Sequence, residues 1–167
     1  TSVAKVTLET DGSAHYSYLS HYGGIQHETV NALLLNKDSE KQKDWIKRRL
    51  KVSDVVFDSF SFEPVKEKAF SVKESASFKI PRLGSISGDR LFFNPQIISS
   101  FVSNVSEKLE ERKDDFYLNP NDYSFVDTDS VTVTIPAGFM VENKPKDLKI
   151  QAPFGEFDFK VSVLTQN

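Results

Sequence analysis

The sequence predicts a mainly β protein: an antiparallel β-sandwich of about nine or ten strands, with one or two short helices inserted after the first hairpin. Two features predict it. Apolar and polar residues alternate along several segments, which is typical of strands with one buried and one solvated face. Proline and glycine residues stand between these segments, where strands must stop and turn. An open barrel is the alternative architecture.

The chain begins with a predicted hairpin. Apolar residues alternate with polar ones over 4–8 and again over 14–18, and Asp11-Gly12 lies between the two runs. Both turn residues tolerate a positive φ, which a tight hairpin turn requires.

After the hairpin, the pattern becomes helical up to residue 50. Ser39 and Gln42 match a capping box at the start of a helix. The narrow apolar stripe of this helix consists of Trp45, Ile46 and Leu50. We therefore expect a surface helix that lies on a sheet and is anchored by Trp45.

The middle of the chain returns to strands. The segment 55–62 is apolar on both faces, so we expect either a central strand or a strand with a bulge, ended by Pro64. The segment 70–80 has one apolar and one polar face, with Glu74 as the odd member of the apolar face. Weaker predictions are a buried strand at 91–93, an ambiguous apolar run at 96–105, a charged loop at 106–115 and an edge strand at 116–118.

The most regular alternation lies near the C-terminus. Over 130–135, valine and isoleucine occupy one face and serine and threonine the other, before Pro136 and Gly138 stop and turn the strand. The apolar segments that follow are 139–141, 148–150 and 157–163. The chain thus ends in a predicted meander whose apolar face must pack against another apolar surface.

We expect a single domain over 1–167, in which 1–50 supply the hairpin and the helical segment and 51–167 supply the main strands. The sequence does not decide whether the first 30 residues belong to this domain. The chain starts at Thr1 rather than at a methionine, which suggests a piece of a longer protein or a processed product. The lack of a signal peptide therefore does not argue for the cytoplasm.

Composition excludes several functions. The net charge is −3 with no basic excess, so nucleic acid and anionic membranes are poor candidates as partners. There is no cysteine, which excludes thiol catalysis, disulfides and thiolate metal sites. No apolar run approaches the roughly 20 residues that a membrane span needs, so we expect no membrane insertion.

Histidines and carboxylates are the candidates for metal or acid–base chemistry. The histidines are His15, His21 and His27, and the carboxylates cluster at Glu107, Glu110, Glu111, Asp114 and Asp115 and again at Asp122, Asp127 and Asp129. No histidine pair has metal-ligand spacing. The second acidic group lacks the glycine and spacing of an EF-hand loop, so it suggests weak calcium binding at most. Acids interleaved with lysine and arginine are typical of a solvated face, whereas an independent hydrolase needs carboxylates that converge in a cleft.

Sequence motifs for other chemistries are absent. Residues 84–88 only loosely resemble a nucleophile elbow, and there is no phosphate loop or dinucleotide fingerprint. We therefore expect no catalytic residue, no metal and no cofactor.

Trp45 is the candidate binding residue. With Tyr16, Tyr18 and Tyr22 it would form a sugar-stacking platform if these rings faced outward, although such rings more often cover the edge of a core. A carbohydrate-binding sandwich of the cell envelope is therefore the alternative function.

Three segments near the C-terminus carry a family resemblance. They are the block 129–142, which contains Ile-Pro-Ala-Gly-Phe-Met-Val-Glu, then Lys144-Pro145, then Ala-Pro-Phe-Gly-Glu-Phe at 152–157. They resemble a C-terminal β-domain of unknown function that follows the transglutaminase-like core in large envelope proteins of Bacteroidetes. Residues 88–95, 24–26, 33–35 and 40–45 also resemble parts of that family's pattern, so the resemblance covers most of the chain.

The resemblance implies a non-catalytic domain. The parent proteins carry a Cys-His-Asp type core upstream, and this chain has no cysteine. By this resemblance the chain is an accessory, structural or protein-interaction domain of a periplasmic or cell-surface protein. Its partner is then the upstream transglutaminase-like domain, with envelope polysaccharide as the alternative, and the helix around Trp45 or an exposed sheet edge is the expected docking surface.

Overall fold

A computed structural model of the protein describes residues 1–24, 26–36, 38–66, 69–98, 124–153 and 155–164. The chain divides into two compact units, Thr1–Thr134 and Ile135–Asn167. The predicted charged loop at 106–115 and edge strand at 116–118 lie outside the described residues.

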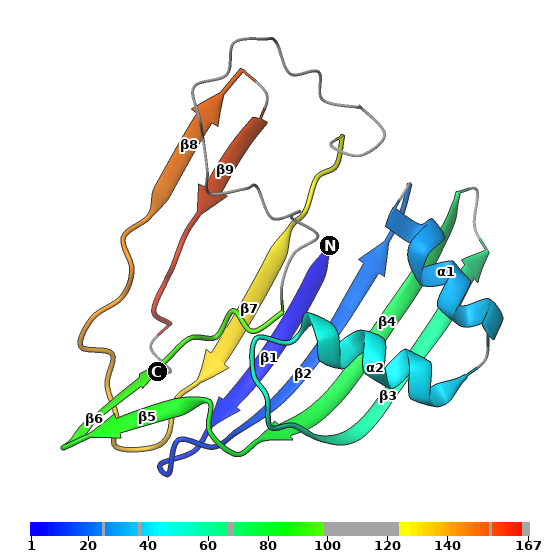
Figure 1. The fold of residues 1–167 in the computed structure, drawn as a ribbon. Helices are drawn as coiled ribbons and strands as arrows, with labels where there is room; N and C mark the ends of the chain where they lie inside the picture. Colours follow the sequence, from blue (N-terminus) through cyan, green and yellow to red (C-terminus); the bar gives the residue numbers. More distant parts are fainter. Residues whose placement is uncertain (25, 37, 67–68, 99–123, 154, 165–167) are drawn as a thin grey trace, which may run out of the picture. The chain divides into compact units, whose positions relative to one another are not determined.

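A five-stranded sheet forms the body of the first unit, in the order β3-β4-β2-β1-β7 (Figure 1). The strands are β1 (Ser2–Leu8), β2 (Ala14–Tyr22), β3 (Val56–Lys66), β4 (Phe70–Ile80) and β7 (Asp129–Thr134). All neighbours pair antiparallel except β1 and β7, which are parallel. The first strands of the chain therefore lie in the middle of the sheet and share its core.

The turn between β1 and β2 is hydrogen-bonded to the start of a second hairpin, which begins at Gly84. Gly12 has a φ of 83°, and its carbonyl accepts hydrogen bonds from the backbone N–H groups of Leu83 (3.0 Å) and Gly84 (2.8 Å). A Cβ at residue 12 would stand 2.7 Å from the Gly84 carbonyl oxygen, so only glycine fits. This contact holds the start of the hairpin formed by β5 (Gly84–Ser87) and β6 (Arg90–Phe93).

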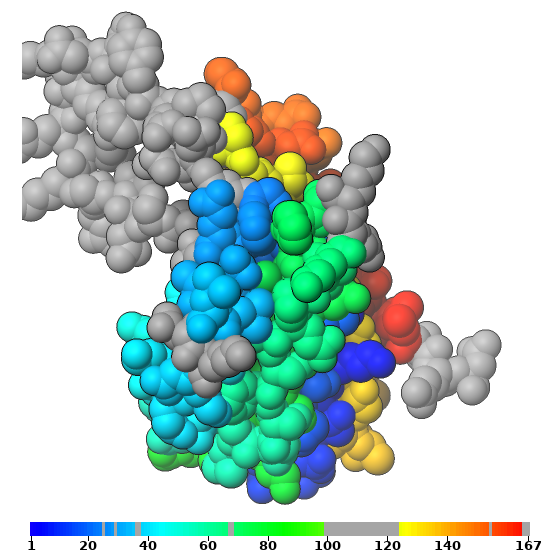
Figure 2. All heavy atoms as spheres, turned by 90° about the vertical axis from the view of Figure 1, so that its right-hand side faces the viewer, coloured from blue at the N-terminus to red at the C-terminus, as the bar shows by residue number. Residues whose placement is uncertain are grey.

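Two helices, α1 (Gln26–Asn36) and α2 (Ser39–Arg49), cover one face of the sheet. Figure 2 shows them, blue to cyan, as one layer against the strands. The predicted capping box is displaced by one residue, because the Asp38 carboxylate accepts the N–H groups of Glu40 and Lys41 and so caps α2. Val30 of α1 and Ile46 of α2 are fully buried against the sheet.

The core is built from aromatic rings lined up by strand register. Val6, Tyr16, Phe78 and Phe57 lie in one row across four strands. Tyr16 stacks on Phe78 with ring centroids 5.4 Å apart, and Phe57 lies at the same centroid distance on the other side. Such pairs stabilise a core by about 0.5–1.5 kcal/mol beyond the burial of their area.

The segment predicted at 55–62 is an edge strand with a bulge. The register of β3 shifts between Phe57 and Ser59, which lets both Phe57 and Phe60 reach the core face although they are three residues apart. The bulge therefore explains the apolar residues on both apparent faces. The expectation of a central strand is wrong at this position.

The mainly β class and the two short helices after the first hairpin are confirmed, but the sandwich is not. The described strands form one five-stranded sheet covered on one face by helices, together with the hairpins β5–β6 and β8–β9. The latter consists of β8 (Leu148–Ala152) and β9 (Gly155–Phe159). Alternation predicts that one face of a strand is buried, but it does not tell whether a helix or a second sheet covers that face.

Candidate functional site

A row of polar residues crosses the helix-covered face of the sheet at one end. Register places Glu74, Ser20, Ser2 and Asp129 next to one another on β4, β2, β1 and β7. The Ser20 hydroxyl donates to the Ser2 hydroxyl at 3.0 Å. Ser20 and Glu74 of this row are buried on a strand face that is otherwise apolar, where polar groups need hydrogen-bond partners, and this makes the row the candidate site.

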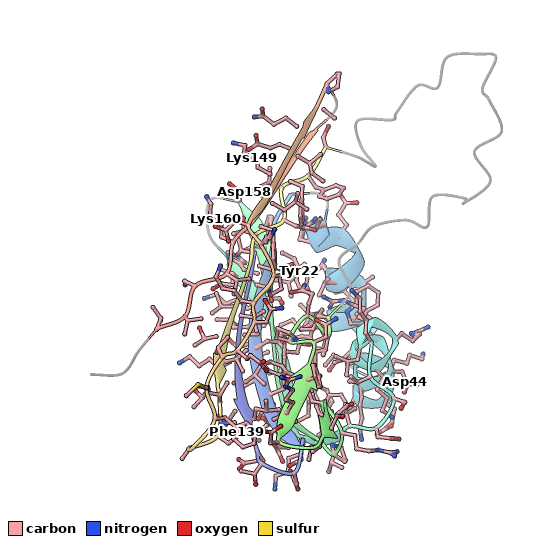
Figure 3. All side chains as sticks on the ribbon, turned by 90° about the vertical axis from the view of Figure 1, so that its left-hand side faces the viewer. Tyr22, Asp44, Phe139, Lys149, Asp158 and Lys160 are labelled. Carbon is pink, nitrogen blue, oxygen red and sulfur yellow. The ribbon has the colours of Figure 1, made fainter. Side chains whose placement is uncertain are left out.

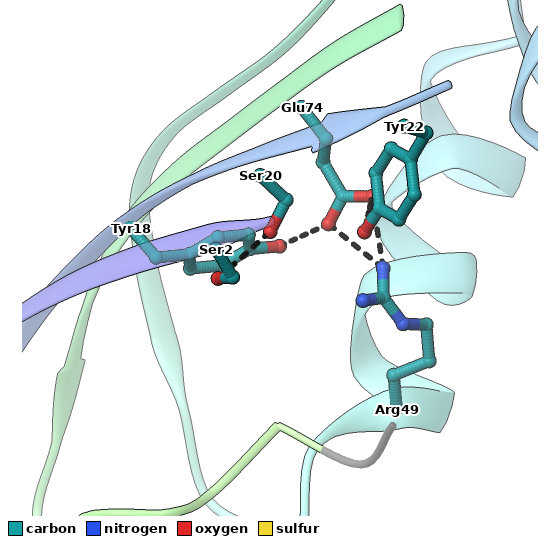
Figure 4. Close-up of polar contacts among 6 residues, drawn as sticks. All are labelled: Ser2, Tyr18, Ser20, Tyr22, Arg49 and Glu74. Carbon is teal, nitrogen blue, oxygen red and sulfur yellow. Dashed lines mark hydrogen bonds and ion pairs between the residues drawn. The ribbon is translucent and has the colours of Figure 1, made fainter. Parts of the chain in front are cut away.

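Glu74 is the centre of this row, with an exposed fraction of 0%. Its carboxylate accepts hydrogen bonds from the hydroxyls of Tyr18 and Tyr22, the latter at 3.1 Å (Figure 4). Arg49 at the end of α2 donates through one nitrogen to both carboxylate oxygens, at 2.9 and 3.1 Å. A buried charge is tolerated where it is paired and hydrogen-bonded in this way.

The Arg49 guanidinium also lies over two aromatic rings. Its central carbon is 5.5 Å from the ring centroid of Tyr22 and 5.6 Å from that of Trp45. Cation–π contacts of this kind favour a charge that has lost water. The pair of Arg49 and Glu74 thereby attaches the C-terminal end of α2 to β4 of the sheet.

Burial keeps the tyrosines of this cluster protonated. Loss of water raises the pKa of the Tyr18 hydroxyl well above its ordinary value, and the Glu74 charge raises it further. The same two causes, in the same order, raise the pKa of Tyr22. Burial works to lower the pKa of Arg49, but the charge of Glu74 and the two tyrosines outweigh it, so that pKa is raised. A proton-transfer catalyst needs a pKa near its working pH, so these groups suit fixed hydrogen bonding better than acid–base chemistry.

A small cavity lies beside the row. Its walls include Ser2, Ser20, Gln26, Arg49, Asp127 and Asp129, and it holds about 40 Å³. Gln26 donates to the Asp127 carboxylate at 2.9 Å. A volume of this size accepts a few water molecules, whereas pockets for organic ligands are typically about 300–1,000 Å³.

The open face of the sheet carries a Ser-His-Asp group. The bulge in β3 brings Asp58 within 2.9 Å of His15 Nε2, and the Ser77 hydroxyl lies 3.2 Å from that same nitrogen. In a nucleophilic triad the serine and the aspartate contact opposite ring nitrogens, because one receives the proton while the other orients the ring. The arrangement is therefore that of a polar surface contact, with both His15 and Asp58 substantially exposed.

Most of the sequence-predicted residues occupy other roles. Trp45 is half-buried and packs against the core. Tyr16, Tyr18 and Tyr22 are each at most 5% exposed, so their faces are inside the protein rather than on a sugar-stacking surface. Within the described residues, no group of three histidine or carboxylate side chains is placed to hold a metal ion.

Of the two carboxylate clusters singled out in the sequence, only part of the second lies within the described residues. Asp127 and Asp129 line the small cavity, but they bind the amides of Gln26 and Gln96. Asp122 and the carboxylates over 107–115 lie outside the described residues.

Sequence reasoning missed the pairing of Glu74 with Arg49. The signal for Glu74 is present, since it is the charged exception on an otherwise apolar strand face. Arg49 carries no comparable signal, because it lies in a run of charged residues on α2.

The hairpin of the second unit has one apolar and one polar face. Register pairs Leu148 with Phe159 and Ile150 with Phe157, and it pairs Lys149 with Asp158 on the opposite face. Figure 3 labels Lys149 and Asp158 on this ribbon. Within this unit nothing covers the apolar face, and Ile150 and Phe157 are exposed by 51% and 53%. An isolated two-stranded hairpin is only marginally stable, so a face of this kind needs a covering surface.

Comparison with known proteins supports only a coarse assignment. Residues 89–167 match DUF3858, a domain of unknown function with a solved structure. No curated protein and no solved structure matches the chain. The matched span runs from β6 to the C-terminus and so includes β7, whose ladder partner β1 lies outside the match. No helix in the described part of the chain is long and apolar enough to cross a membrane.

Proposed function

We propose that this chain is a non-catalytic interaction domain of a larger exported protein, periplasmic or on the cell surface. Its partner is the transglutaminase-like domain upstream in the same polypeptide. The sequence resemblance described above supports this context, and the match of residues 89–167 to a domain of unknown function agrees with it at a coarser level.

The apolar face of the β8–β9 hairpin is the observation that carries the proposal. It presents Leu148, Ile150, Phe157 and Phe159 together on one side of a ribbon whose other side is charged and polar. Contiguous apolar side chains at a surface are typical of protein contacts, and aromatic rings contribute most of the binding energy in such contacts.

The buried polar cluster supports an interaction domain rather than an enzyme. Glu74, Arg49, Tyr18 and Tyr22 satisfy one another and fix α2 to the sheet. The cavity beside them is too small for an organic substrate.

Calorimetric titration of this chain with the separately expressed upstream domain tests the proposal. We expect binding that Phe157→Lys weakens at least about tenfold, which corresponds to about 1.4 kcal/mol. Gln151→Lys is the matched control, because it places the same side chain on the polar face of the hairpin, where register sets it opposite Glu156. Its binding should stay within about twofold of the unchanged chain, since a charge on the polar face leaves the apolar contact intact.

A panel of envelope polysaccharides serves as the comparison titration. No binding to the upstream domain, or equal binding by Phe157→Lys, would contradict the proposal. Saccharide binding without binding to the upstream domain would favour the carbohydrate-binding alternative.

A further inference from the structure

The five-stranded sheet ends at two strands of different character, β3 and β7. The β3 edge carries several features that discourage pairing with another chain. It has the bulge between Phe57 and Ser59, Pro64 within the strand, and the charged residues Glu63 and Lys66. Among the described residues, no strand pairs with the outer side of β3 or of β7.

The β7 edge has none of these protections. From Ser130 to Thr134 it is uncharged and rich in β-branched residues, and its register with β1 is unbroken. A regular, uncharged edge is a template for a further strand.

The hydrogen-bonding phase of β7 shows which backbone groups point outward. The Ser2 N–H donates to the Thr128 carbonyl at 2.8 Å. In a parallel ladder, alternate residues of a strand bond to the same neighbour, so Ser130, Thr132 and Thr134 also face β1. The N–H and C=O groups of Asp129, Val131 and Val133 therefore point away from the sheet.

The β7 sequence is self-complementary about Thr132. If two copies run antiparallel with the two Thr132 residues opposite each other, Val131 of each copy lies opposite Val133 of the other. The outward N–H and C=O groups of these two valines then face each other and can form hydrogen bonds between the copies. Both valines stay on the helix-covered face and the threonines stay on the open face in both copies. Asp129 lies opposite Ile135 rather than opposite its own copy, so no like charges face each other.

We propose that the β7 edge pairs antiparallel with β7 of a second copy of this chain. The contact is a twofold one in which the same edge serves both copies, and it joins two five-stranded sheets into one continuous sheet. The pairing uses the backbone of β7 and no residue of the β8–β9 hairpin, so the proposal stands or falls independently of the function proposed above.

Sedimentation of the whole chain over a range of concentrations tests the pairing. We expect a monomer–dimer equilibrium. Thr132→Glu places two like charges opposite each other at the twofold axis, while within its own chain the new carboxylate lies opposite Lys5 of β1, so it should weaken dimerisation at least about tenfold without loosening β7. Thr7→Glu is the matched control, because residue 7 lies on β1, off the proposed edge, and pairs with Thr134 in the ladder. It should leave dimerisation nearly unchanged.

A mixture of two charge variants makes the register itself testable. Thr132→Lys mixed with Thr132→Glu should recover a dimer that neither variant forms well alone, because opposite charges then meet at the axis. Circular dichroism checks that each variant keeps its fold. A chain that stays monomeric at all concentrations would overturn the proposal, as would a dimer insensitive to Thr132→Glu or a mixture that fails to recover it.

Discussion

The β1–β2 and β8–β9 hairpins are alike in pattern and opposite in environment. Both are antiparallel pairs in which apolar side chains alternate with polar ones. In the first, Val6 and Tyr16 are each 1% exposed within the core, whereas Ile150 and Phe157 of the second are about half exposed. Alternation therefore specifies that a strand has a face to bury, but the rest of the chain decides whether that face is covered.

The largest expected effect follows from breaking the buried ion pair of the covered sheet. Glu74→Ala leaves the Arg49 guanidinium buried without the carboxylate, and removal of one partner of a buried pair costs about 3–5 kcal/mol. Urea denaturation measures this loss in the free energy of unfolding. Asp54→Ala, which breaks the exposed contact with Arg82, should cost less than about 1 kcal/mol. Equal losses in the two variants would contradict the role of Glu74.

Truncation of one phenylalanine in the covered sheet, on β4 beside the first hairpin, and of one in the β8–β9 hairpin compares the two environments directly. Phe78→Ala empties a fully buried position between Tyr16 and Phe57, so we expect a loss of about 3–5 kcal/mol in stability. Phe157→Ala removes a half-exposed ring and should change the free energy of unfolding by less than about 1 kcal/mol. A large loss from Phe157→Ala would mean that this face is already covered within the chain.

A glycine pair tests the turns of the two units. Gly12→Ala combines a positive φ with a Cβ 2.7 Å from a backbone oxygen, and we expect it to lower stability by about 2–3 kcal/mol. Gly138→Ala has a similar φ of 87°, but nothing lies within 4 Å of the new Cβ. We therefore expect it to lower the free energy of unfolding by about 1 kcal/mol. Thermal melting of both variants makes the comparison. Similar melting temperatures would show that the contact with Gly84 contributes little.

High pH should destabilise the covered sheet alone, with the smallest effect per group. The folded-state pKa values of Tyr18 and Tyr22 are raised above the ordinary value of 10.0, so the stabilisation from their protonated forms is complete below pH 10 and is lost as pH rises further. About 1 kcal/mol per tyrosine is expected to be lost one pH unit above that value. The β8–β9 hairpin contains no tyrosine and lacks this contribution.

Denaturation at pH 9 and pH 11 measures this effect. Tyr18→Phe lacks one of the titrating groups and should show a smaller difference between the two pH values. The same difference in both proteins would remove Tyr18 as a cause.

Local pattern predicted the strands well and their partners poorly. The alternation of 4–8, 14–18 and 70–80 placed β1, β2 and β4, and Asp11-Gly12 placed the turn between the first two. The parallel pairing of β1 with β7 had no local signal, because it depends on residues far apart in the chain. The same holds for the helices that cover the sheet in place of a second sheet.

The candidate site was less predictable than the fold. Glu74 was recognisable as a charged exception on an apolar face, but its partner Arg49 lies among other charges on α2. Only the packing of α2 on β4 and β2 brings them together. The bulge that places Asp58 beside His15 is likewise a property of strand pairing rather than of the sequence nearby.

The pairing of β1 with β7 has a consequence for the order of events during synthesis. Ser2 and Asp129 are ladder partners, and 127 positions separate them (129 minus 2). The β1–β2 hairpin closes a short loop and forms early, whereas the other edge of β1 stays open until residue 134 has left the ribosome. A growing chain therefore displays that edge of β1 until β7 emerges. A fragment confined to residues 89–167 would carry β7 with no strand of its own sheet to receive it.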